Sequence, residues 1–395
     1  MGEHPIDVSV IVPCYNVESY VDQTLSSAED NDVARIEIIA VNDGSTDGTL
    51  EILQAHEAKD PRVRVIDKPN GGYGAAVNRG IDEARGVYVA ILESDDYVLP
   101  HMYDDLYDLA RQMGEPDVVR SSYWRVICAD EGKGAVADAG AIADAGTGTG
   151  VDAAGERRIH GYCYRRIHPR TQPFVLGEAP QLIQYHPAVW SGLYRRDFLR
   201  AEGVRMMEVP GGGWVDNPFV VDALARAKAI AYTDDAWYCY REDIAGTSTA
   251  ARTARLAFER WSDRQDILDR LGVRDRGILR ANYVVLFRFA AAALASGELE
   301  DPDIRTLAAA QFARLDPAIA LGIDECGWAV QALYRETVGA TPWRSPAADR
   351  LIGKTLYTGH LISEGLWSLG ANGVRATFDG MLLARTRARQ EGERK

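Results

Sequence analysis

Three carboxylates stand within four residues of one another, directly after an apolar run in VYVAILESDDYV at residues 87–98. They are Glu93, Asp95 and Asp96. Carboxylates crowded at the end of a buried strand repel one another and lose hydration, so a divalent cation that shares the charge best explains the cluster. The sequence therefore predicts a metal-assisted enzyme.

The acidic run follows the last of four strand-like segments between residues 8 and 92. Short runs rich in β-branched residues alternate there with polar, helix-like segments, which predicts a buried, mostly parallel sheet of the doubly wound kind. The predicted strands are VSVIV, RIEIIAV, VRVI and VYVAIL, and the predicted helices lie near residues 18–30, 47–59 and 74–85.

Polar residues follow each predicted strand, in PCYN, NDGSTD, NGGYG and the acidic run. Ligands of doubly wound sheets bind beyond the carboxyl ends of the strands, so these residues are expected to surround one crevice. The glycine segment Gly72-Tyr73-Gly74 lacks the last glycine of GxGxxG and follows the third strand rather than the first. The sequence therefore argues against a Rossmann dehydrogenase.

In their order and spacing, these segments resemble the catalytic domain of glycosyltransferase family 2, whose GT-A fold binds a nucleotide-sugar. The resemblance covers about residues 7–250. It implies an α/β protein with a doubly wound, mostly parallel GT-A sheet flanked by helices. It also implies an inverting transfer of a sugar to an acceptor hydroxyl, in the assembly of bacterial-type polysaccharide, glycolipid or another glycoconjugate. The stretches that carry it are VSVIVPCYNVESYVDQTLSS, IEIIAVNDGSTDGT, NGGYGAAVNRGI and GVYVAILESDDYV.

Two residues are candidates for holding the base of the donor. Tyr15 suits stacking on a nucleobase or is a buried turn tyrosine, and the resemblance implies the first role. Asp43 only accepts hydrogen bonds, so it favours a base edge with an N–H, as in uracil, thymine or guanine. The alternative for Asp43 is a helix cap, a role for which Asp47 is better placed. The family implies uridine most often, so the expected donor is a UDP-sugar.

The resemblance implies further donor contacts around the same crevice. Asn70 and Asn78 would lie near the ribose and diphosphate, and Arg241 would meet the diphosphate unless it forms an ordinary surface ion pair. The complete predicted donor-binding set is Pro13, Tyr15, Asn16, Asp43, Asn70, Gly71, Asn78, Ser94 and Arg241.

The acidic run matches the metal-binding DXD element of the family with one departure, because Glu93 stands where Asp is usual. A Mg2+ or Mn2+ ion would bridge the donor phosphates and neutralise charge on the leaving nucleoside diphosphate. Asp95 is the better direct ligand, whereas Glu93 is also able to reach a ribose hydroxyl or a metal-bound water. The alternative is that these acids cap the following helix.

The second half of the resemblance implies a catalytic base, Asp216 in PGGGWVDNPF. An inverting transfer needs a base that takes the proton from the attacking acceptor hydroxyl. Asp216 is also a candidate helix N-cap, and the two roles are compatible. The expected acceptor-side residues are Trp190, which has a core position as its alternative, Trp214 and Asn217.

The 395 residues are enough for two domains. We expect a GT-A domain at 1–250, with a nucleotide-binding half at about 1–125 and an acceptor-side half at about 176–250. A Gly/Ala-rich stretch at about 130–156 predicts a loop or insertion, because it buries too little apolar surface to offset its ordering entropy. Helical periodicity predicts a C-terminal all-α domain at 251–395.

Composition restricts the partners and the compartment. A net charge of −14 argues against nucleic acid. Five cysteines without a CxxC pair indicate neither a zinc ribbon nor a disulfide framework, so we expect a cytoplasmic protein. No signal sequence or membrane span is expected, because the longest apolar run, residues 284–295, is short and contains Arg288.

The expected partners are the nucleotide-sugar donor and a carbohydrate or glycolipid acceptor. The near repeat of RRIH at 157–160 and 165–168 is interpreted as a solvated basic loop, with an anion site as the alternative. A basic tail would allow peripheral contact with anionic lipid at the inner face of the membrane. It contains Arg385, Arg387, Arg389, Arg394 and Lys395.

Two other functions remain open at this point. A sugar nucleotidyltransferase also uses a doubly wound sheet and a metal, but it needs a Gly-rich, basic loop after the first strand, and PCYN contains no Gly, Lys or Arg. A non-catalytic nucleotide-sugar binder is suggested by the departure at Glu93 and would bind UDP without consuming any donor.

Overall fold

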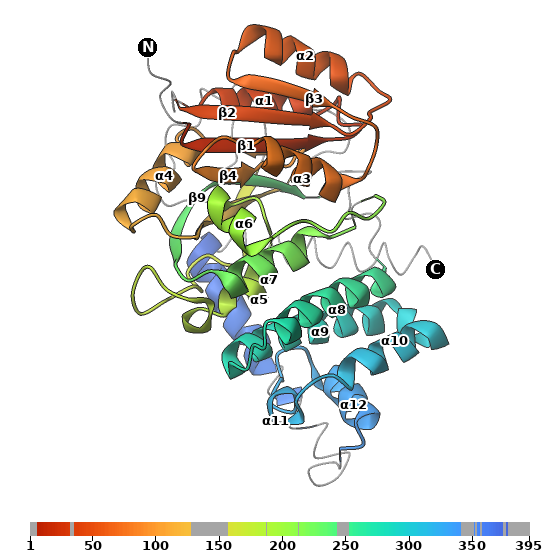
Figure 1. The fold of residues 1–395 in the computed structure, drawn as a ribbon. Coiled ribbons are helices and arrows are strands. Elements are labelled where there is room, and N and C mark those ends of the chain that lie inside the picture. The colour runs from red at the N-terminus through yellow and green to blue at the C-terminus, as the bar shows by residue number, and fades with distance from the viewer. Residues whose placement is uncertain are drawn as a thin grey trace. The chain divides into compact units, whose positions relative to one another are not determined.

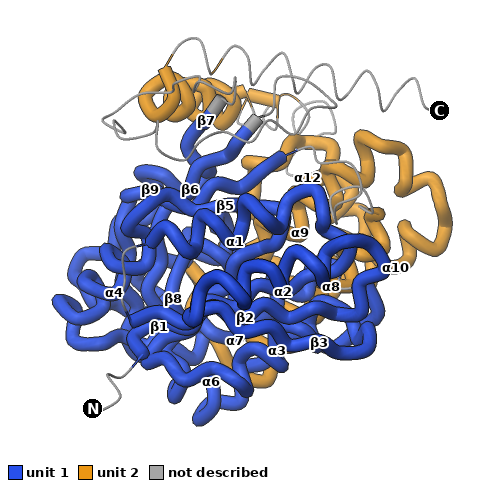
Figure 2. The backbone as a smooth tube through the Cα atoms, turned by 90° about the horizontal axis from the view of Figure 1, so that it is seen from above, with its two compact units in different colours: residues 1–250 blue, residues 251–395 orange. Residues whose placement is uncertain are grey.

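The computed structural model divides the chain into two compact units, residues 1–250 and 251–395 (Figure 2). The structure describes residues 6–31, 35–127, 157–186, 188–211, 213–242, 253–340, 351, 354–355, 358–373 and 377. The predicted Gly/Ala-rich insertion and the basic tail lie outside these residues.

In the described part of unit 1, a nine-stranded sheet flanked by helices forms the frame (Figure 1). Its order is β3-β2-β1-β4-β8-β6-β9-β5, with β7 paired to β6. The α/β prediction is confirmed, and β1 to β4 are parallel as expected. The remainder of the sheet is mixed rather than mostly parallel, because β8 runs antiparallel to both β4 and β6. The strands are β1 (Val8–Cys14), β2 (Ile36–Asn42), β3 (Val63–Asp67), β4 (Tyr88–Ile91), β5 (Tyr97–Val98), β6 (Val118–Ile127), β7 (Arg157–His160), β8 (Gly192–Arg195) and β9 (Ile230–Glu242).

The helices of unit 1 cover this sheet. Every residue of β1 and β2 is buried, as expected for central strands that are covered on both faces. Helix α3 approaches β1 closely, because a Cβ at Gly80 would lie 2.4 Å from Cγ2 of Ile11. The helices are α1 (Val21–Glu29), α2 (Thr49–Lys59), α3 (Tyr73–Glu83), α4 (Met102–Gln112), the short 3-10 helix η2 (Leu176–Glu178), α5 (Gln181–Tyr185), α6 (Arg196–Glu202) and α7 (Asp216–Arg226).

In unit 2 all the described elements are helices, in agreement with the expected helical region. Its core contains the rings of Phe287, Phe312 and Tyr334, whose centroids lie 5.5 Å apart in each pair. The helices are α8 (Ala254–Arg270), α9 (Arg276–Ser296), η3 (Glu298–Glu300), α10 (Pro302–Phe312), α11 (Pro317–Ala320) and α12 (Trp328–Thr337).

Helix α9 is long and apolar enough to cross a membrane by length and composition, with a mean hydropathy of 1.5. Of its most apolar window, 56% is buried inside the protein. Phe287 and Ala290 of α9 belong to the core of unit 2. A buried core helix is apolar on most sides for the same reason as a membrane span, so burial accounts for this composition.

Candidate active site

The polar strand ends lie at one edge of the sheet, because β1, β2, β3 and β4 are parallel and in register. Cys14 pairs with Asn42, and Asn42 pairs with Asp67. The backbone N–H of Asp43 donates to the carbonyl of Cys14 at 2.8 Å, which joins the first two polar segments directly. The expected crevice residues therefore start from one rim.

The acidic run is a tight turn between β4 and β5. The N–H of Asp96 donates to the carbonyl of Glu93 at 3.1 Å, so Ser94 and Asp95 form the corner. Burial raises the pKa of Glu93 to about 8, and the charges of Asp95 and Asp216 add to the effect. Burial also raises the pKa of Asp95 and holds that of Asp96 well above its usual range. The turn therefore gathers three carboxyl groups whose ionisation is opposed by burial.

Asp216 comes from the second half of unit 1 and acts electrostatically on the acidic turn. It is half-buried in the first turn of α7, whose N-cap residue is Val215, so the N-cap alternative for Asp216 is wrong. Asn217 donates from its amide to Oδ1 of Asp216 at 3.2 Å. Tyr73 Oη donates to Oε1 of Glu93 at 2.6 Å, and burial together with Glu93 and Asp216 raises its pKa well above the usual value. Glu93, Tyr73 and Asp216 therefore form one electrostatic group.

The two base-binding candidates differ in accessibility. Tyr15 is 50% exposed, so its ring is accessible to a planar ligand. Asp43 is buried, and its carboxylate accepts hydrogen bonds from Lys68 and from the N–H groups of Gly71 at 2.9 Å and Gly72 at 2.8 Å. Asp43 thus shapes the glycine loop. The N-cap residue of α2 is Gly48, so neither Asp43 nor Asp47 is its N-cap, although Asp47 Oδ1 accepts the N–H of Thr49 at 3.1 Å beside the helix start.

The other predicted donor residues differ in whether they are accessible at the rim or held within the fold. Asn70 and Gly71 are exposed on the rim, and Ser94 forms part of the acidic turn. Pro13 is a buried residue of β1, and Asn16 accepts the N–H of Thr46 at 2.8 Å.

Asn78 is not brought to the rim. Its amide nitrogen donates to the carbonyl of Met206 and to Glu208, both at 2.9 Å, and its oxygen accepts the N–H of Met206 at 2.9 Å. This fully bonded, buried side chain joins α3 to the segment that leads towards Asp216. A direct donor contact by Asn78 stays a prediction that this geometry does not favour.

Two further candidates are buried. Trp190 is 6% exposed, and its ring stacks on Tyr238 with centroids 4.3 Å apart, which corresponds to the core alternative. Arg241 is 7% exposed and donates to the carbonyl of Asp95 at 2.7 Å, so the alternative of a surface ion pair is wrong. Trp214, by contrast, is half-buried beside Asp216 with a positive φ of 57°.

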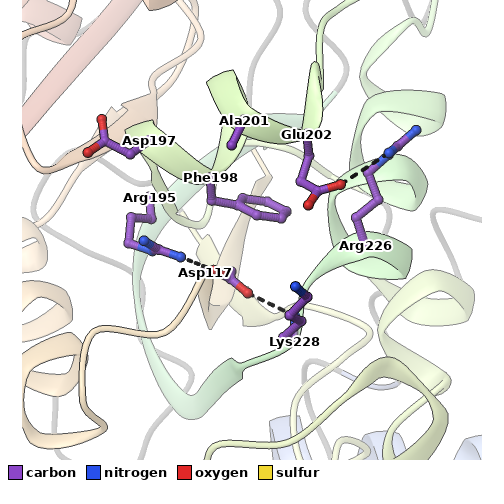
Figure 3. Close-up of a pocket in the computed structure, with 8 residues that line it drawn as sticks. All are labelled: Asp117, Arg195, Asp197, Phe198, Ala201, Glu202, Arg226 and Lys228. Atoms are coloured by element: carbon purple, nitrogen blue, oxygen red, sulfur yellow. Dashed lines mark hydrogen bonds and ion pairs between the residues drawn. The ribbon is translucent and has the colours of Figure 1, made fainter.

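A pocket of about 330 Å3 lies at the opposite edge of the sheet (Figure 3). Arg195 in its wall pairs with Tyr88 at the start of β4, whereas the acidic turn follows the end of that strand. Two ion pairs lie in its wall, between Asp117 and Arg195 and between Glu202 and Arg226. The pocket is therefore separate from the candidate site. It is lined by Asp117, Arg195, Asp197, Phe198, Ala201, Glu202, Arg226 and Lys228.

Comparison with known proteins agrees with this geometry. Residues 9–133 match the profile of the family described as Glycosyl transferase family 2, and this range contains all four polar strand ends. The chain is 31% identical over 251 residues to the uncharacterized glycosyltransferase EpsJ of Bacillus subtilis, which covers 60% of this chain and 61% of EpsJ. Residues 9–133 therefore form a domain of the glycosyltransferase family 2 type.

Other relatives match over shorter stretches. The chondroitin synthase of Pasteurella multocida is 42% identical over 93 residues, which is 24% of this chain and 10% of the synthase. The chain thus spans less than two thirds of the length of these relatives. Among solved structures, residues 1–349 of TarS from S. aureus, in complex with UDP-GlcNAc, superpose with a TM-score of 0.61 at 18% identity, covering 91% of this chain and 92% of TarS 1–349. That likeness confirms the GT-A fold.

The carboxylates of the acidic turn fit a hard divalent cation of the Mg2+ or Mn2+ type. Glu93 and Asp95 offer oxygen ligands, and burial raises the pKa of both carboxyl groups, so a bound cation would favour their ionised forms. Among the described residues no three His, Cys, Asp or Glu side chains form a closed metal cage. Magnesium sites commonly use one or two carboxylates and take their remaining ligands from substrate phosphates and water. The donor set therefore suits a cation that binds with a nucleotide.

Sequence reasoning missed two residues of the site. Tyr73 was considered only as part of the glycine loop, yet its hydroxyl bonds to Glu93. Lys68, which bonds to Asp43, directly follows β3 and is not among the predicted donor-binding residues. Both lie next to predicted strand ends, so a systematic reading of every polar residue there would have found them.

Proposed function

We propose that this protein is an inverting glycosyltransferase that uses a UDP-sugar and a divalent cation. The observation that carries the proposal is the electrostatic group of Glu93, Tyr73 and Asp216. It brings a carboxylate of the second half to the acidic turn of the first. A nucleotide-sugar held at the turn would then have its sugar near Asp216.

The donor assignment is supported by the bonding of Asp43. A carboxylate offers about four acceptor positions, and Lys68, Gly71 and Gly72 occupy three of those on Asp43. One position remains, which suits the single ring N–H of uracil, while the exposed ring of Tyr15 is available for stacking. The UDP-GlcNAc complex of TarS, with the same fold, supports this choice.

Asp95 and Glu93 would hold the cation together with the donor phosphates. When bound, a divalent cation neutralises the charge that builds on the departing nucleoside diphosphate. Arg241 would act indirectly, because its buried guanidinium donates to the backbone carbonyl of Asp95 and so holds that residue in place.

Asp216 is proposed as the catalytic base. Inversion requires the acceptor hydroxyl to attack the anomeric carbon from the face opposite the leaving group, and a base must take its proton. Asp216 starts α7, so the direction of its carboxylate is set by the helix, and the amide of Asn217 bonds to it.

Exchange of Asp216 for Asn tests the base assignment. With Mn2+ and a panel of UDP-sugars, Asp216→Asn is expected to lower transfer or donor hydrolysis at least about 100-fold, the usual contribution of a general base. UDP binding, measured by calorimetry, should persist. Asp197→Asn is the matched control, because Asp197 is an exposed carboxylate on α6 with a 70% exposed side chain. Retained turnover in Asp216→Asn would refute the assignment.

We also propose a cytoplasmic location with peripheral contact to anionic lipid at the inner face of the membrane, where a glycolipid acceptor would be found. In the helix over 358–373, Leu361, Ile362 and Leu366 are 51%, 59% and 64% exposed, and the sequence beyond it carries six Lys and Arg residues. Apolar insertion combined with basic charge is the usual pattern for such contact.

Cosedimentation with vesicles that contain phosphatidylglycerol tests this contact. The Ile362→Ser, Leu366→Ser double variant should lose most of its vesicle binding. Leu294→Ser serves as the control, since Leu294 is 40% exposed on α9. Equal binding by both variants would exclude a role for this helix.

A further inference from the structure

The acidic turn is held from behind by β9, which lies far from it in the sequence. The hydroxyl of Tyr238 accepts the N–H of Glu93 at 3.1 Å. The same hydroxyl donates to Oδ2 of Asp96 at 2.8 Å. One phenol on β9 therefore joins the first and the last residue of the turn.

The other carboxylate oxygen of Asp96 also bonds to β9. Oδ1 accepts the backbone N–H of Arg241 at 2.8 Å, three residues beyond Tyr238. Asp96 is 1% exposed, and each of its oxygens bonds to this strand. The carboxylate of Asp96 is thus used inside the fold, unlike that of its neighbour Asp95.

Helix α1 holds the turn from a second direction. The hydroxyl of Thr24 lies 2.9 Å from the carbonyl of Ser94 and 2.7 Å from that of Asp96. Gln23, the preceding residue, accepts a hydrogen bond from the guanidinium of Arg241. The backbone of the turn is therefore bonded on both sides.

The position of the Tyr238 hydroxyl is itself fixed by packing. Tyr238 is 0% exposed, and its ring lies parallel to that of Trp190, with an interplanar angle of 16°. Trp190 stacks in turn on Tyr240, with centroids 5.2 Å apart. A phenol held in such a stack cannot follow movements of the turn, so it sets the place of the residues bonded to it.

We propose that Tyr238 and Asp96 are positioning residues for the divalent cation. Their hydrogen bonds fix the turn so that Glu93 and Asp95 present their carboxylates in one geometry before the nucleotide arrives. The inference rests on the proposed function, because it assigns the cation to Glu93 and Asp95. Partners that orient metal ligands commonly change metal affinity by 10–100-fold when they are removed.

The substitution Tyr238→Phe tests this inference, because it removes the hydroxyl and keeps the stacked ring. Mn2+ binding in the presence of UDP is followed through the paramagnetic resonance signal of the free ion. We expect Tyr238→Phe to bind Mn2+ at least about tenfold more weakly. UDP binding without metal should be unchanged. The matched control is Tyr103→Phe, because Tyr103 is 1% exposed and its hydroxyl has no hydrogen-bond partner among the described residues.

The outcomes separate the inference from the proposed function. If the wild-type protein binds no Mn2+ with UDP, the proposed metal site fails and the inference fails with it. If the wild type binds Mn2+ and Tyr238→Phe matches Tyr103→Phe, only the positioning role is overturned. If Tyr238→Phe does not fold by circular dichroism, Asp96→Asn decides the question, since unchanged Mn2+ affinity in that variant overturns the proposal.

Discussion

The two halves of the sheet in unit 1 differ in where they place polar side chains, although the parallel half also buries the bonded pair Ser9 and Glu37. In the parallel half, β1 to β4, polar residues gather at the strand ends, where a ligand would reach Tyr15 and Asp95. In the mixed half, β8, β6 and β9, polar and charged residues are buried within the sheet layer. Arg120 on β6 is 0% exposed, and its guanidinium donates to the hydroxyl of Tyr194 at 2.6 Å and to the carbonyl of Val189 at 3.2 Å.

This difference separates residues that are available to a ligand from residues that hold the site in place. Ser191 illustrates the second kind, because it is buried and donates to the carbonyl of Ser121 at 2.8 Å. His186 is likewise buried against Ser191, with Nε2 at 2.6 Å from its hydroxyl. The mixed half therefore acts as a rigid support that carries Tyr238 and Arg241 to the back of the acidic turn.

Among the variants that test this difference between the halves, replacement of Arg120 is expected to lower the free energy of unfolding most. In Arg120→Met, the carbonyls of Ala188 and Val189 lose a buried donor, and each unsatisfied group costs about 1–3 kcal/mol. We therefore expect the free energy of unfolding, measured in urea, to fall by at least about 2 kcal/mol. Arg120→Lys should recover only part of this lost stability, because an ammonium lacks the planar, forked arrangement of N–H donors of a guanidinium.

A surface arginine from the parallel half provides the contrast. Arg79 on α3 has a 52% exposed side chain and pairs with Glu83 at 2.9 Å, four residues along the helix. Arg79→Met should cost at most about 0.5 kcal/mol, as is usual for exposed pairs at this spacing. Equal losses for the Arg120 and Arg79 variants would contradict the distinction between the halves.

The same difference explains what the sequence predicts well. The four parallel strands and the rim residues follow from local patterns, because each polar segment directly follows its own apolar run. The partners of Asp96 could not be predicted in this way, because Tyr238 and Arg241 reach it through a strand pairing that no local pattern specifies. The burial of Trp190 was left open for the same reason.

The two copies of RRIH are similar in sequence but differ in structure, because only one of them pairs with a strand. In the RRIH near repeat, the first copy pairs with β6 and forms β7, whereas the second belongs to no helix or strand. The rings of His160 and Tyr164 stack with centroids 3.5 Å apart, a contact available only to the copy that lies beside β6. A solvated basic loop is therefore wrong for the first copy.

A smaller effect on the free energy of unfolding is expected from two histidines, His56 and His186, whose pKa values are shifted in opposite directions. His56 in the parallel half lies between two carboxylates, with Nδ1 at 2.6 Å from Glu29 and Nε2 at 3.2 Å from Asp22. The hydrogen bond to Glu29 raises the pKa of His56 above 6.5. Burial, with the charge of Arg120, lowers the pKa of His186 well below that value.

The sign of each shift sets its pH window. The pKa of His56 is higher in the folded state, so its contribution is complete below about pH 6.5 and is lost as the pH rises through the folded value. For His186 the contribution is present above about pH 6.5 and is lost as the pH falls. Urea unfolding of wild type and His56→Asn should therefore differ by about 0.5–1 kcal/mol more at pH 5.5 than at pH 8.5. A difference that is the same at both pH values would show that His56 is held as a neutral ring, like His186, and would remove this contrast between the halves.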